Sequence, residues 1–505
     1  MYRAAGLLIW IMVAVLAAEV FGRIRFPYDL YFASESPFMT NMLKLDAGEP
    51  LFTAVEQMNS HIYAPGMEAL FWAIAKPLGL VHDVRAARLL VVALGALAAL
   101  TVGRVISAET NTHTSIYSGI TLLILFKNFT ADLVHPDNFH VLHTVVTLAL
   151  ALAAHRQRSF RWAMIAVLWA GLGVWTKQTA VLTVVGVLVG FAWIAWFQED
   201  DYPRSDTKED EDQRRRVDDS VGLILLAGGG VATVVASVAG LWGIEFGRFY
   251  TYELSLMHDI FPKKLLDLPR LWLVMPHKLI LLGLLPIALR RLWMQPARRP
   301  FLILWTTIGI FGTGASLIAY LKAFGTWNNL GIFDVWMTMP VLIMIATEME
   351  RLAIVQTHWR WVGVFALLTL FPLRMPPPPS YYAWASAWEG LISADLHANR
   401  RILLANGTTL LTRSGSYDVP LDRAAAATDL KGANLMPTAT HQRLADQQYD
   451  RIYLNVPNWY ADQTLRLMAD HYKRVDTLPA PSPAYRYLFG YQKELFETVL
   501  ILEPR

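Results

Sequence analysis

Two carboxylates stand six residues apart in an aromatic segment near the amino terminus. The segment FPYDLYFASESPF, at positions 26–38, contains Asp29 and Glu35. Apolar surroundings raise the pKa of a carboxyl group, which suits a general base that takes a proton from a hydroxyl nucleophile. Glu35 precedes a helix expected over residues 37–45, which Gly48 can end. The alternative is therefore that Glu35 is only an acidic residue at a helix N-terminus.

A second group of polar residues lies in the sequence ADLVHPDN at positions 131–138. Asp132, His135 and Asp137 could bind the hydroxyl groups of a substrate, and Asp137 could also take part in catalysis. Carboxylates and imidazole also coordinate divalent cations, but three mixed ligands in one loop are a weak metal signal. We therefore expect no metal and no other cofactor, and keep a divalent cation as the alternative.

Basic residues that could bind an anionic group are spread further along the chain. They are Arg85, Arg88, Lys177 within WTKQ, His258, Lys263, Lys264 and Lys322. Phosphate groups are bound by side chains of this kind. For an isolated lysine, the alternative is an ammonium group that only reaches out of the membrane into water. Lys177 is the strongest candidate, because a lysine on the outer side between two apolar segments opposes the usual distribution of positive charge.

Apolar segments dominate the elements that must position these groups. Of the 505 residues, 54% are hydrophobic and 17% are charged. A helix of about 20 apolar residues crosses the hydrocarbon core and satisfies its own backbone hydrogen bonds there. The sequence therefore predicts an all-α polytopic membrane protein. Because the chain has no cysteine, disulfides and thiolate chemistry are excluded, and its net charge of +3 does not indicate a nucleic-acid partner.

The hydrophobic segments predict about eleven transmembrane helices. They cover residues 4–21, 88–106, 114–130, 139–154, 160–175, 179–197, 220–244, 271–289, 301–322, 330–347 and 359–373. With the N-terminus in the cytoplasm, the basic clusters at 155–158, 214–216, 290–299 and 351–360 all face inside, as positive charge does in membrane proteins. Residues 65–80 would reverse this arrangement if they crossed, so we predict an interfacial helix there. The first outer loop then extends from residue 22 to residue 87.

Two other segments differ in composition from the predicted spans. Residues 198–219 are almost entirely polar and predict a disordered cytoplasmic linker. After four consecutive prolines at 376–379 the composition becomes that of a soluble protein, with strands expected at 401–405, 450–456 and 498–502 and helices at 440–448 and 460–472. We therefore expect a membrane domain over residues 1–375 and a small α/β domain over 376–505, outside the inner (plasma) membrane.

The order of several short motifs resembles the polytopic C-type glycosyltransferase superfamily, which includes protein O-mannosyltransferases and lipid A aminoarabinose transferases. After the first-loop acid come Gly48-Glu49-Pro50-Leu51-Phe52, Tyr63-Ala64-Pro65, Ala87-Arg88-Leu89, Pro136-Asp137, Thr176-Lys177 and Gly325 with Asn328-Asn329. Many relatives carry Asp, often Asp-Glu, at the first-loop acid, where this chain has Ser34-Glu35 and an aspartate only at position 29. We favour Glu35 as the base because of its spacing to Gly48, and keep Asp29 as the alternative.

The resemblance implies inverting transfer of a sugar from a polyprenyl-phosphate donor to a hydroxyl of a lipid, glycan or protein acceptor, outside the bilayer. Glu35 would be the base, and Lys177 and Arg88 would stabilise the departing lipid phosphate. The other expected substrate-binding residues are Tyr63, Asp132, His135, His258, Lys263 and Asn328. Two rival functions are a lipid-linked glycan flippase or transporter, and a non-catalytic membrane scaffold. A transporter should show paired repeats or charges within its spans, and the sequence shows no repeat and nearly charge-free spans.

Overall fold

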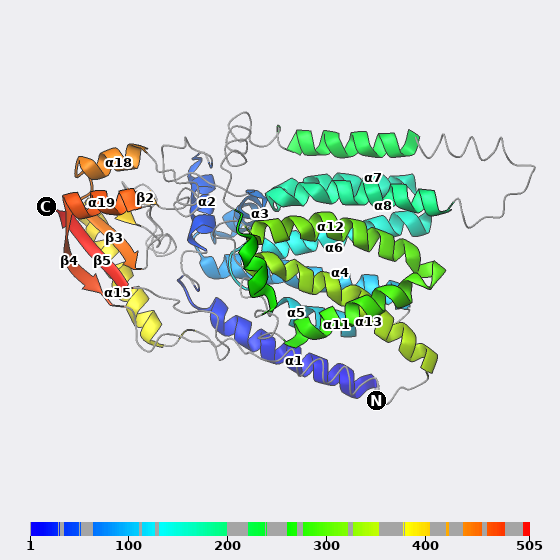
Figure 1. Ribbon diagram of the computed structural model, residues 1–505. Coiled ribbons are helices and arrows are strands. Elements are labelled where there is room, and N and C mark those ends of the chain that lie inside the picture. The colour runs from blue at the N-terminus through cyan, green and yellow to red at the C-terminus, as the bar shows by residue number, and fades with distance from the viewer. Residues whose placement is uncertain are drawn as a thin grey trace, which may run out of the picture.

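A helical bundle with a β-sheet beyond one of its ends forms the fold (Figure 1). The computed structural model describes residues 2–28, 30, 35–49, 51, 64–110, 114–126, 131–198, 221–237, 239, 260–269, 276–321, 327–352, 377, 379–404, 421–423, 438–456, 462–479 and 498–505. We call the end of the bundle that faces the sheet the sheet end, and the opposite end, where α1 begins, the basic end.

Apolar helices make up the bundle. They are α1 (Tyr2–Ile24), α4 (Val84–Thr110), α5 (Thr114–Leu125), α6 (Asp137–Gln157), α7 (Phe160–Gly171) with η2 (Leu172–Trp175), α8 (Leu182–Gln198), Val221–Ser237, α11 (Pro276–Trp293), α12 (Arg299–Leu321) and α13 (Gly331–Leu352). Four described helices are long and apolar enough to cross a membrane by length and composition: Gly6–Ile24, Val84–Thr110, Asp137–Gln157 and Pro296–Leu321. The chain is therefore a membrane protein. The count of about eleven spans stays a prediction, and the expected span at 359–373 lies outside the described residues.

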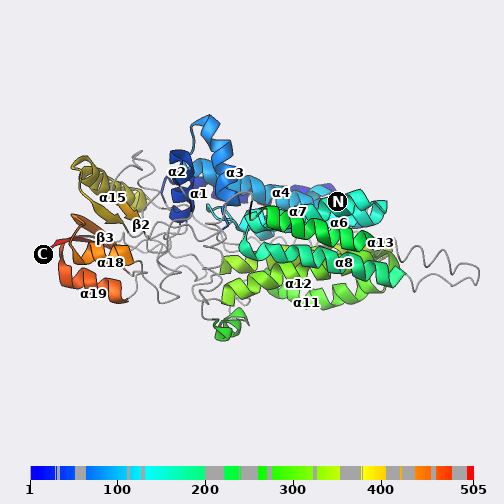
Figure 2. The ribbon, with the colours of Figure 1, turned by 90° about the horizontal axis from the view of Figure 1, so that it is seen from above.

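Arginines from separate helices meet at the basic end. Glu109, near the end of α4, accepts hydrogen bonds from Arg156 at the end of α6 and from Arg298 in η5 (Pro296–Arg298), which precedes α12. The Glu109 side chain is buried, and a buried carboxylate is costly unless it is paired. The two guanidinium groups compensate its charge. These contacts bring the ends of α4 and α6 and the start of α12 together, on the side of the bundle away from the sheet (Figure 2).

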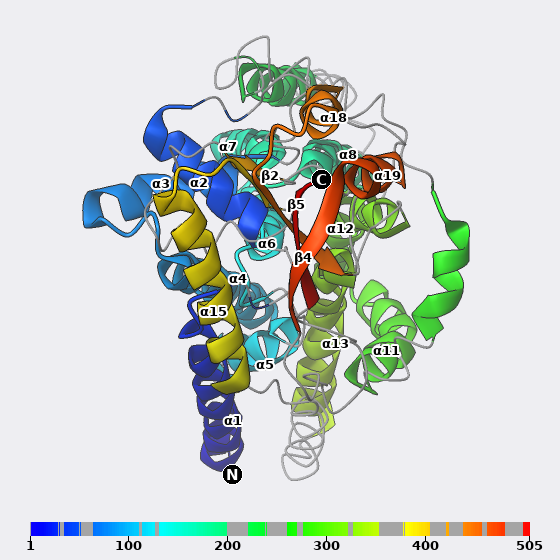
Figure 3. The same ribbon diagram turned by 90° about the vertical axis from the view of Figure 1, so that its left-hand side faces the viewer.

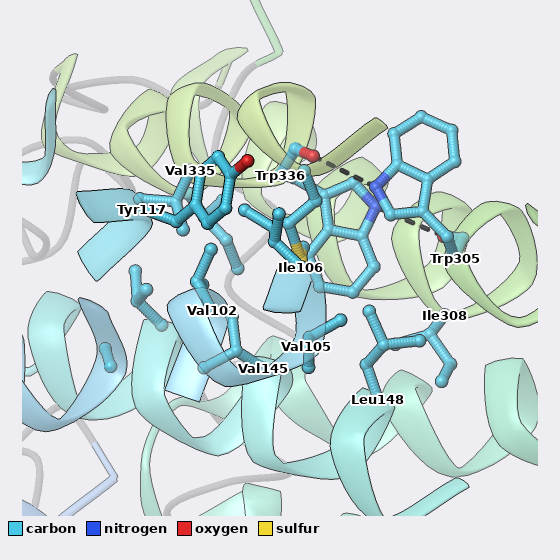
Figure 4. Packing of buried hydrophobic residues seen from close by; sticks show 14 of the residues in the cluster. Val102, Val105, Ile106, Tyr117, Val145, Leu148, Trp305, Ile308, Val335 and Trp336 are labelled. Carbon is cyan, nitrogen blue, oxygen red and sulfur yellow. Dashed lines mark hydrogen bonds between the residues drawn. The ribbon is translucent and has the colours of Figure 1, made fainter. Parts of the chain in front are cut away.

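Two tryptophans lock α12 to α13 inside the bundle (Figure 4). The indole of Trp305 donates to the backbone oxygen of Trp336 at 2.9 Å, and the indole of Trp336 donates to that of Trp305 at 3.1 Å. A side chain at Gly309 would collide with the Trp336 ring, so glycine is required there. Because buried indole N–H groups need acceptors, this reciprocal pair fixes how the two helices pack. Residues of both helices line the pocket described below.

Two short helices lie at the sheet end of the bundle. They are α2 (Ser36–Ala47), which Gly48 ends in a left-handed conformation, and α3 (Gly66–Ala75), which continues into η1 (Lys76–Leu78). The ten residues of α3 are about 15 Å long, half of what a crossing needs. Residues 65–80 are therefore not a span. Asn41 of α2 donates to the buried carboxyl of Glu68 in α3 at 3.0 Å, and burial raises the pKa of Glu68 to about 8.

One mixed sheet and three helices form the described part of the carboxy-terminal region, which we call the sheet unit. The helices are α15 (Pro379–His397), α18 (Thr438–Ala445) and α19 (Asp462–His471), and the strands are β1 (Ile402–Leu404), β2 (Leu421–Arg423), β3 (Arg451–Val456), β4 (Tyr472–Leu478) and β5 (Thr498–Pro504). The strand order is β2-β1-β3-β5-β4, with β1 parallel to its neighbours and β5 antiparallel to its own. Strands β1, β3 and β5 lie where the sequence places strands, whereas β2 and β4 were not expected. The polar linker expected at 198–219 lies outside the described residues, apart from residue 198.

Candidate active site

A lysine at the sheet end is held between a carboxylate and an amide. Lys177 Nζ lies 2.6 Å from Asn329 Oδ1 and 3.3 Å from Asp137 Oδ1. The second oxygen of Asp137 lies 2.9 Å from His135 Nδ1. The side chains of His135, Asp137 and Lys177 are only 17%, 11% and 12% exposed. Four polar residues from three parts of the chain thus converge in a shielded setting.

Local structure explains how these residues meet. Asp137 is the first residue of α6, directly after Pro136, and a carboxylate at this position interacts favourably with the positive end of the helix dipole. Lys177 follows η2, which packs against α6 so closely that a side chain at Gly173 would collide with the ring of His143. Asn329 lies in η6 (Trp327–Leu330), which leads into α13. The site therefore depends on the packing of η2, α6 and α13.

A small pocket lies beside these groups, between α5, α6, α12 and α13. It is lined by Leu125, Asp137, Asn138, His140, Val141, Lys177, Ser316, Asn329, Gly331 and Ile332. His140 and Ser316 are fully buried, and His140 Nε2 lies 3.5 Å from Ser316 Oγ. On its polar side the pocket presents the ammonium group of Lys177 with Asp137 and Asn329, and an ammonium group of this kind can bind an anion.

Sequence reasoning missed His140, Ser316 and Asn329. His140 could have been found, because it follows Asp137 by three residues and so shares its face of α6. Ser316 gave no signal, since serine within an apolar helix usually bonds to its own backbone, as this one also does to Gly312. Asn329 stood beside the predicted Asn328. The side chain of Asn328 is outside the described part of the chain.

Glu35 lies outside this pocket, in a buried ion pair with Arg88. Arg88 donates to the two carboxylate oxygens through Nε at 2.7 Å and Nη2 at 2.5 Å. The backbone N–H groups of Leu30 and Val134 donate to the same carboxylate at 2.9 and 3.0 Å. Both charged side chains are 0% exposed. With four donors on its oxygens, the Glu35 carboxylate is held inside the fold, and its role as general base stays a prediction.

Arg88 is likewise held by contacts within the fold. Besides Glu35, its guanidinium donates to the backbone oxygens of Phe26 and Tyr28. It therefore holds the first outer loop against the start of α4. Its expected role in binding phosphate stays a prediction.

Asp132 forms a second buried ion pair at the sheet end. Its Oδ2 lies 2.6 Å from Arg23 Nε, and the two side chains are 1% and 4% exposed. This pair ties the end of α1 to the segment at residues 131–136, before α6. Asp132 is thus paired with Arg23, whereas Asp137 contacts His135 and Lys177, which divides the set considered for a divalent cation. Among the residues that the structure describes, no group of three or more histidines and carboxylates could hold a metal ion.

The remaining predicted residues lie elsewhere or are not described. Asp29, Tyr63 and His258 fall outside the described residues. Lys263 is exposed in η4 (Pro262–Leu266), and neighbouring Lys264 donates to the backbone oxygen of Tyr320 at 3.1 Å, so neither lines the pocket.

One buried charge pair corrects the expectation of nearly charge-free spans. Lys278 Nζ in α11 lies 3.1 Å from Asp334 Oδ2 in α13, and the side chains are 7% and 1% exposed. Each residue lies within a predicted span, close to where its helix begins. Ionisable residues within membrane helices are costly unless paired, which explains why the two occur together.

Comparisons with known proteins agree with this architecture. Residues 64–200 match the model of the family described as Dolichyl-phosphate-mannose-protein mannosyltransferase. The fold is similar to that of ArnT from Cupriavidus metallidurans bound to undecaprenyl phosphate, with a TM-score of 0.56 and 14% identity over 97% of each chain. The apo state of ArnT from the same organism gives a TM-score of 0.52 and 14% identity over 99% of this chain and 98% of that one. A search of curated proteins finds no match.

Proposed function

We propose that this chain, a member of the polytopic C-type glycosyltransferase superfamily, transfers a sugar from a polyprenyl-phosphate donor to a hydroxyl group of an acceptor. The family match supports the transferase class, and the fold is that of a protein whose structure holds undecaprenyl phosphate. The observation that carries the proposal is Lys177, held between Asp137 and Asn329 beside a polar pocket.

Lys177 supplies the charge that the leaving group needs. When the bond between the anomeric carbon and the phosphate oxygen breaks, negative charge grows on the lipid phosphate. An ammonium group that is already oriented stabilises this charge at little reorganisation cost. A lysine has three N–H donors, and Asp137 and Asn329 orient Nζ by accepting from it.

The acceptor hydroxyl needs a base, which we assign to Asp29. In the proposed step its carboxylate takes the hydroxyl proton, and the oxygen attacks the anomeric carbon opposite the leaving phosphate, with inversion. Support comes from the two residues beside it. The Tyr28 carbonyl accepts from Arg88, and the Leu30 N–H donates to Glu35, so the buried ion pair anchors both neighbours of Asp29. Asp137 then serves to orient Lys177 and His135.

We assign the orientation in the membrane from the charges at the two ends of the bundle. Positive residues concentrate at the basic end, which we assign to the cytoplasm together with the N-terminus. The sheet end and the sheet unit then lie outside the inner (plasma) membrane. A lipid, glycan or protein acceptor would approach from that side.

A donor panel tests the proposal. Purified protein in lipid nanodiscs is incubated with polyprenyl-phosphate sugars, and released polyprenyl phosphate and glycosylated product are measured by mass spectrometry. Wild type should release lipid phosphate, and Lys177→Ala should lower kcat by about 100-fold or more, as the loss of one transition-state donor does. Lys473→Ala, an exposed position in β4, is the matched control and should retain activity. A wild type that is inert with every donor but moves solute across vesicles would support the transporter instead.

A further inference from the structure

A groove with a volume of about 420 Å³ lies at the basic end of the bundle, between the ends of α8 and α11 and the start of α12. Figures 2 and 3 show these three helices next to one another along one side of the bundle. The residues that line the groove include Trp193 of α8, Leu289, Arg290 and Trp293 of α11, and Leu302 and Ile303 of α12. Proteins bind small molecules in cavities of about 300–1,000 Å³, so the groove has room for part of a ligand. It shares no residue with the pocket beside Lys177.

Most of the lining is apolar, and the groove is open on its outer side. Leu289 and Trp293 stand four residues apart and so share one face of α11. Leu302 and Ile303, on the inner side, are each 3% exposed, whereas Trp193 and Trp293 are 37% and 40% exposed. Tryptophan is enriched where membrane helices reach the interface between hydrocarbon and water. We therefore expect the open side of the groove to meet lipid.

One charged residue lines the groove, and the described part of the chain offers it no counter-ion. Arg290 is exposed, and no carboxylate of the described residues pairs with it. By contrast, Arg298 pairs with Glu109, and Arg299 donates to the backbone oxygen of Trp293 at 3.3 Å. A guanidinium group binds a phosphate through two parallel hydrogen bonds. Arg290 is thus placed to bind an anionic group at the edge of an apolar groove.

We propose that the groove binds an anionic phospholipid from the bilayer leaflet at the basic end. Its phosphate would contact Arg290, and part of an acyl chain would pack between α8, α11 and α12. The apolar lining favours a lipid over a free anion. The positive charges of Arg291 and Arg299 nearby favour a headgroup with net negative charge over a zwitterionic one. This site is separate from the Lys177 pocket, and the inference does not rest on the proposed function.

Native mass spectrometry of the purified full-length protein tests the headgroup preference. The protein in detergent is titrated with phosphatidylglycerol or with phosphatidylcholine of the same acyl chains. Wild type should bind phosphatidylglycerol at least about fivefold more tightly, as one arginine at a membrane surface provides. Arg290→Met should bring the two affinities within twofold of each other. Arg291→Met is the matched control, because it removes the same charge from the neighbouring exposed residue, which does not line the groove. It should keep the preference.

A second variant tests the acyl-chain part of the site without changing charge. Thr306 of α12 lines the groove, and Thr306→Phe adds a ring to it. This variant should weaken the binding of both lipids at least about fivefold, because the ring takes the place of the chain. Ile310→Phe is its control, since Ile310 lies one turn further along α12, is 62% exposed and does not line the groove. Ile310→Phe should bind both lipids as wild type does.

Three outcomes would overturn the proposal. Equal affinity of wild type for the two lipids would remove the headgroup preference. An equal loss in Arg290→Met and Arg291→Met would show attraction to the basic end in general, without a site. Displacement of phosphatidylglycerol by excess inorganic phosphate would indicate an anion site that binds no lipid chain. Since Arg290 is exposed, Arg290→Met should fold even if Thr306→Phe does not, and it then decides the test. The result is independent of whether the protein transfers sugar.

Discussion

Removal of the buried charges of Glu35 and Arg88 should reveal strong coupling between them. Each single variant leaves one charge buried without its partner, which costs about 3–5 kcal/mol in proteins. Arg88→Met should cost more than Glu35→Gln, because it also removes hydrogen bonds to the carbonyls of Phe26 and Tyr28, each worth about 1 kcal/mol. The double variant leaves neither charge uncompensated. It should therefore be no less stable than Arg88→Met alone.

These free energies translate into modest shifts of the melting temperature. Unfolding entropy of about 2.1 cal/mol/K per residue over 505 residues gives roughly 1 kcal/mol per degree. Glu35→Gln should thus lower Tm by about 3–5 °C, and Arg88→Met by a few degrees more. The two effects should fall short of additivity by about 3 °C, which corresponds to a coupling free energy of about 3 kcal/mol.

Thermal unfolding of the four proteins in one detergent measures this coupling. The matched control is Arg85→Met, in α4 like Arg88, since Arg85 pairs with Asp83 at 2.8 Å but is 53% exposed. An exposed pair contributes about 0–1 kcal/mol, so this control should shift Tm by about 1 °C or less. Additive effects of Glu35→Gln and Arg88→Met, within 1 °C, would refute the account of a closed and fully desolvated ion pair.

Variants at three other places in the structure test further parts of it. Asn329→Leu removes the oxygen that accepts a hydrogen bond from Lys177 Nζ at 2.6 Å. Release of polyprenyl phosphate should then slow at least tenfold, with little change in Tm. Unchanged release would exclude Asn329 from the site. Burial raises the pKa of Glu68 to about 8 in the folded protein, against about 4.3 in an unfolded chain. The folded state therefore keeps a proton that the unfolded state loses, and the free energy of unfolding should fall as the pH rises from 5 to 8. Glu68→Gln should abolish this fall in Tm, and an identical pH profile would contradict the assignment. Lys278→Met and Asp334→Leu should each lower the free energy of unfolding by about 3–5 kcal/mol, because each leaves one buried charge unpaired. The double variant should return close to the wild-type Tm and still transfer sugar. Loss of transfer in a stable double variant would give the pair a functional role.

Local patterns in the sequence were sufficient for the elements at the membrane surface. The break of residues 65–80 by Lys76 and Pro77, together with the distribution of arginines, predicted a short helix, and α3 ends at Ala75. Gly48 ends α2 because it alone permits the left-handed turn with low strain. Asp137, His135 and Lys177 were singled out because each is a charged or titratable residue beside an apolar segment, and the structure places the three side chains together.

Long-range pairing was not visible in the sequence. Glu35 looked like a base because it stood among aromatics, but its partner Arg88 lies 53 residues away, and only the folded chain shows that the two neutralise each other. Asp132 was grouped with its sequence neighbours, yet it pairs with Arg23, 109 residues away. Spacing along the chain reports on shared faces of one helix. It cannot report which charge of another helix will satisfy a buried group.

The position of the lipid phosphate tests the central claim most directly. A density map of the wild-type protein in nanodiscs with added polyprenyl phosphate would locate it. We predict a phosphate oxygen at about 3 Å from Lys177 Nζ, between Asp137 and Asn329, with the lipid tail leaving the sheet end toward the bilayer. A phosphate bound at the arginines of the basic end, with the Lys177 pocket empty, would contradict the account.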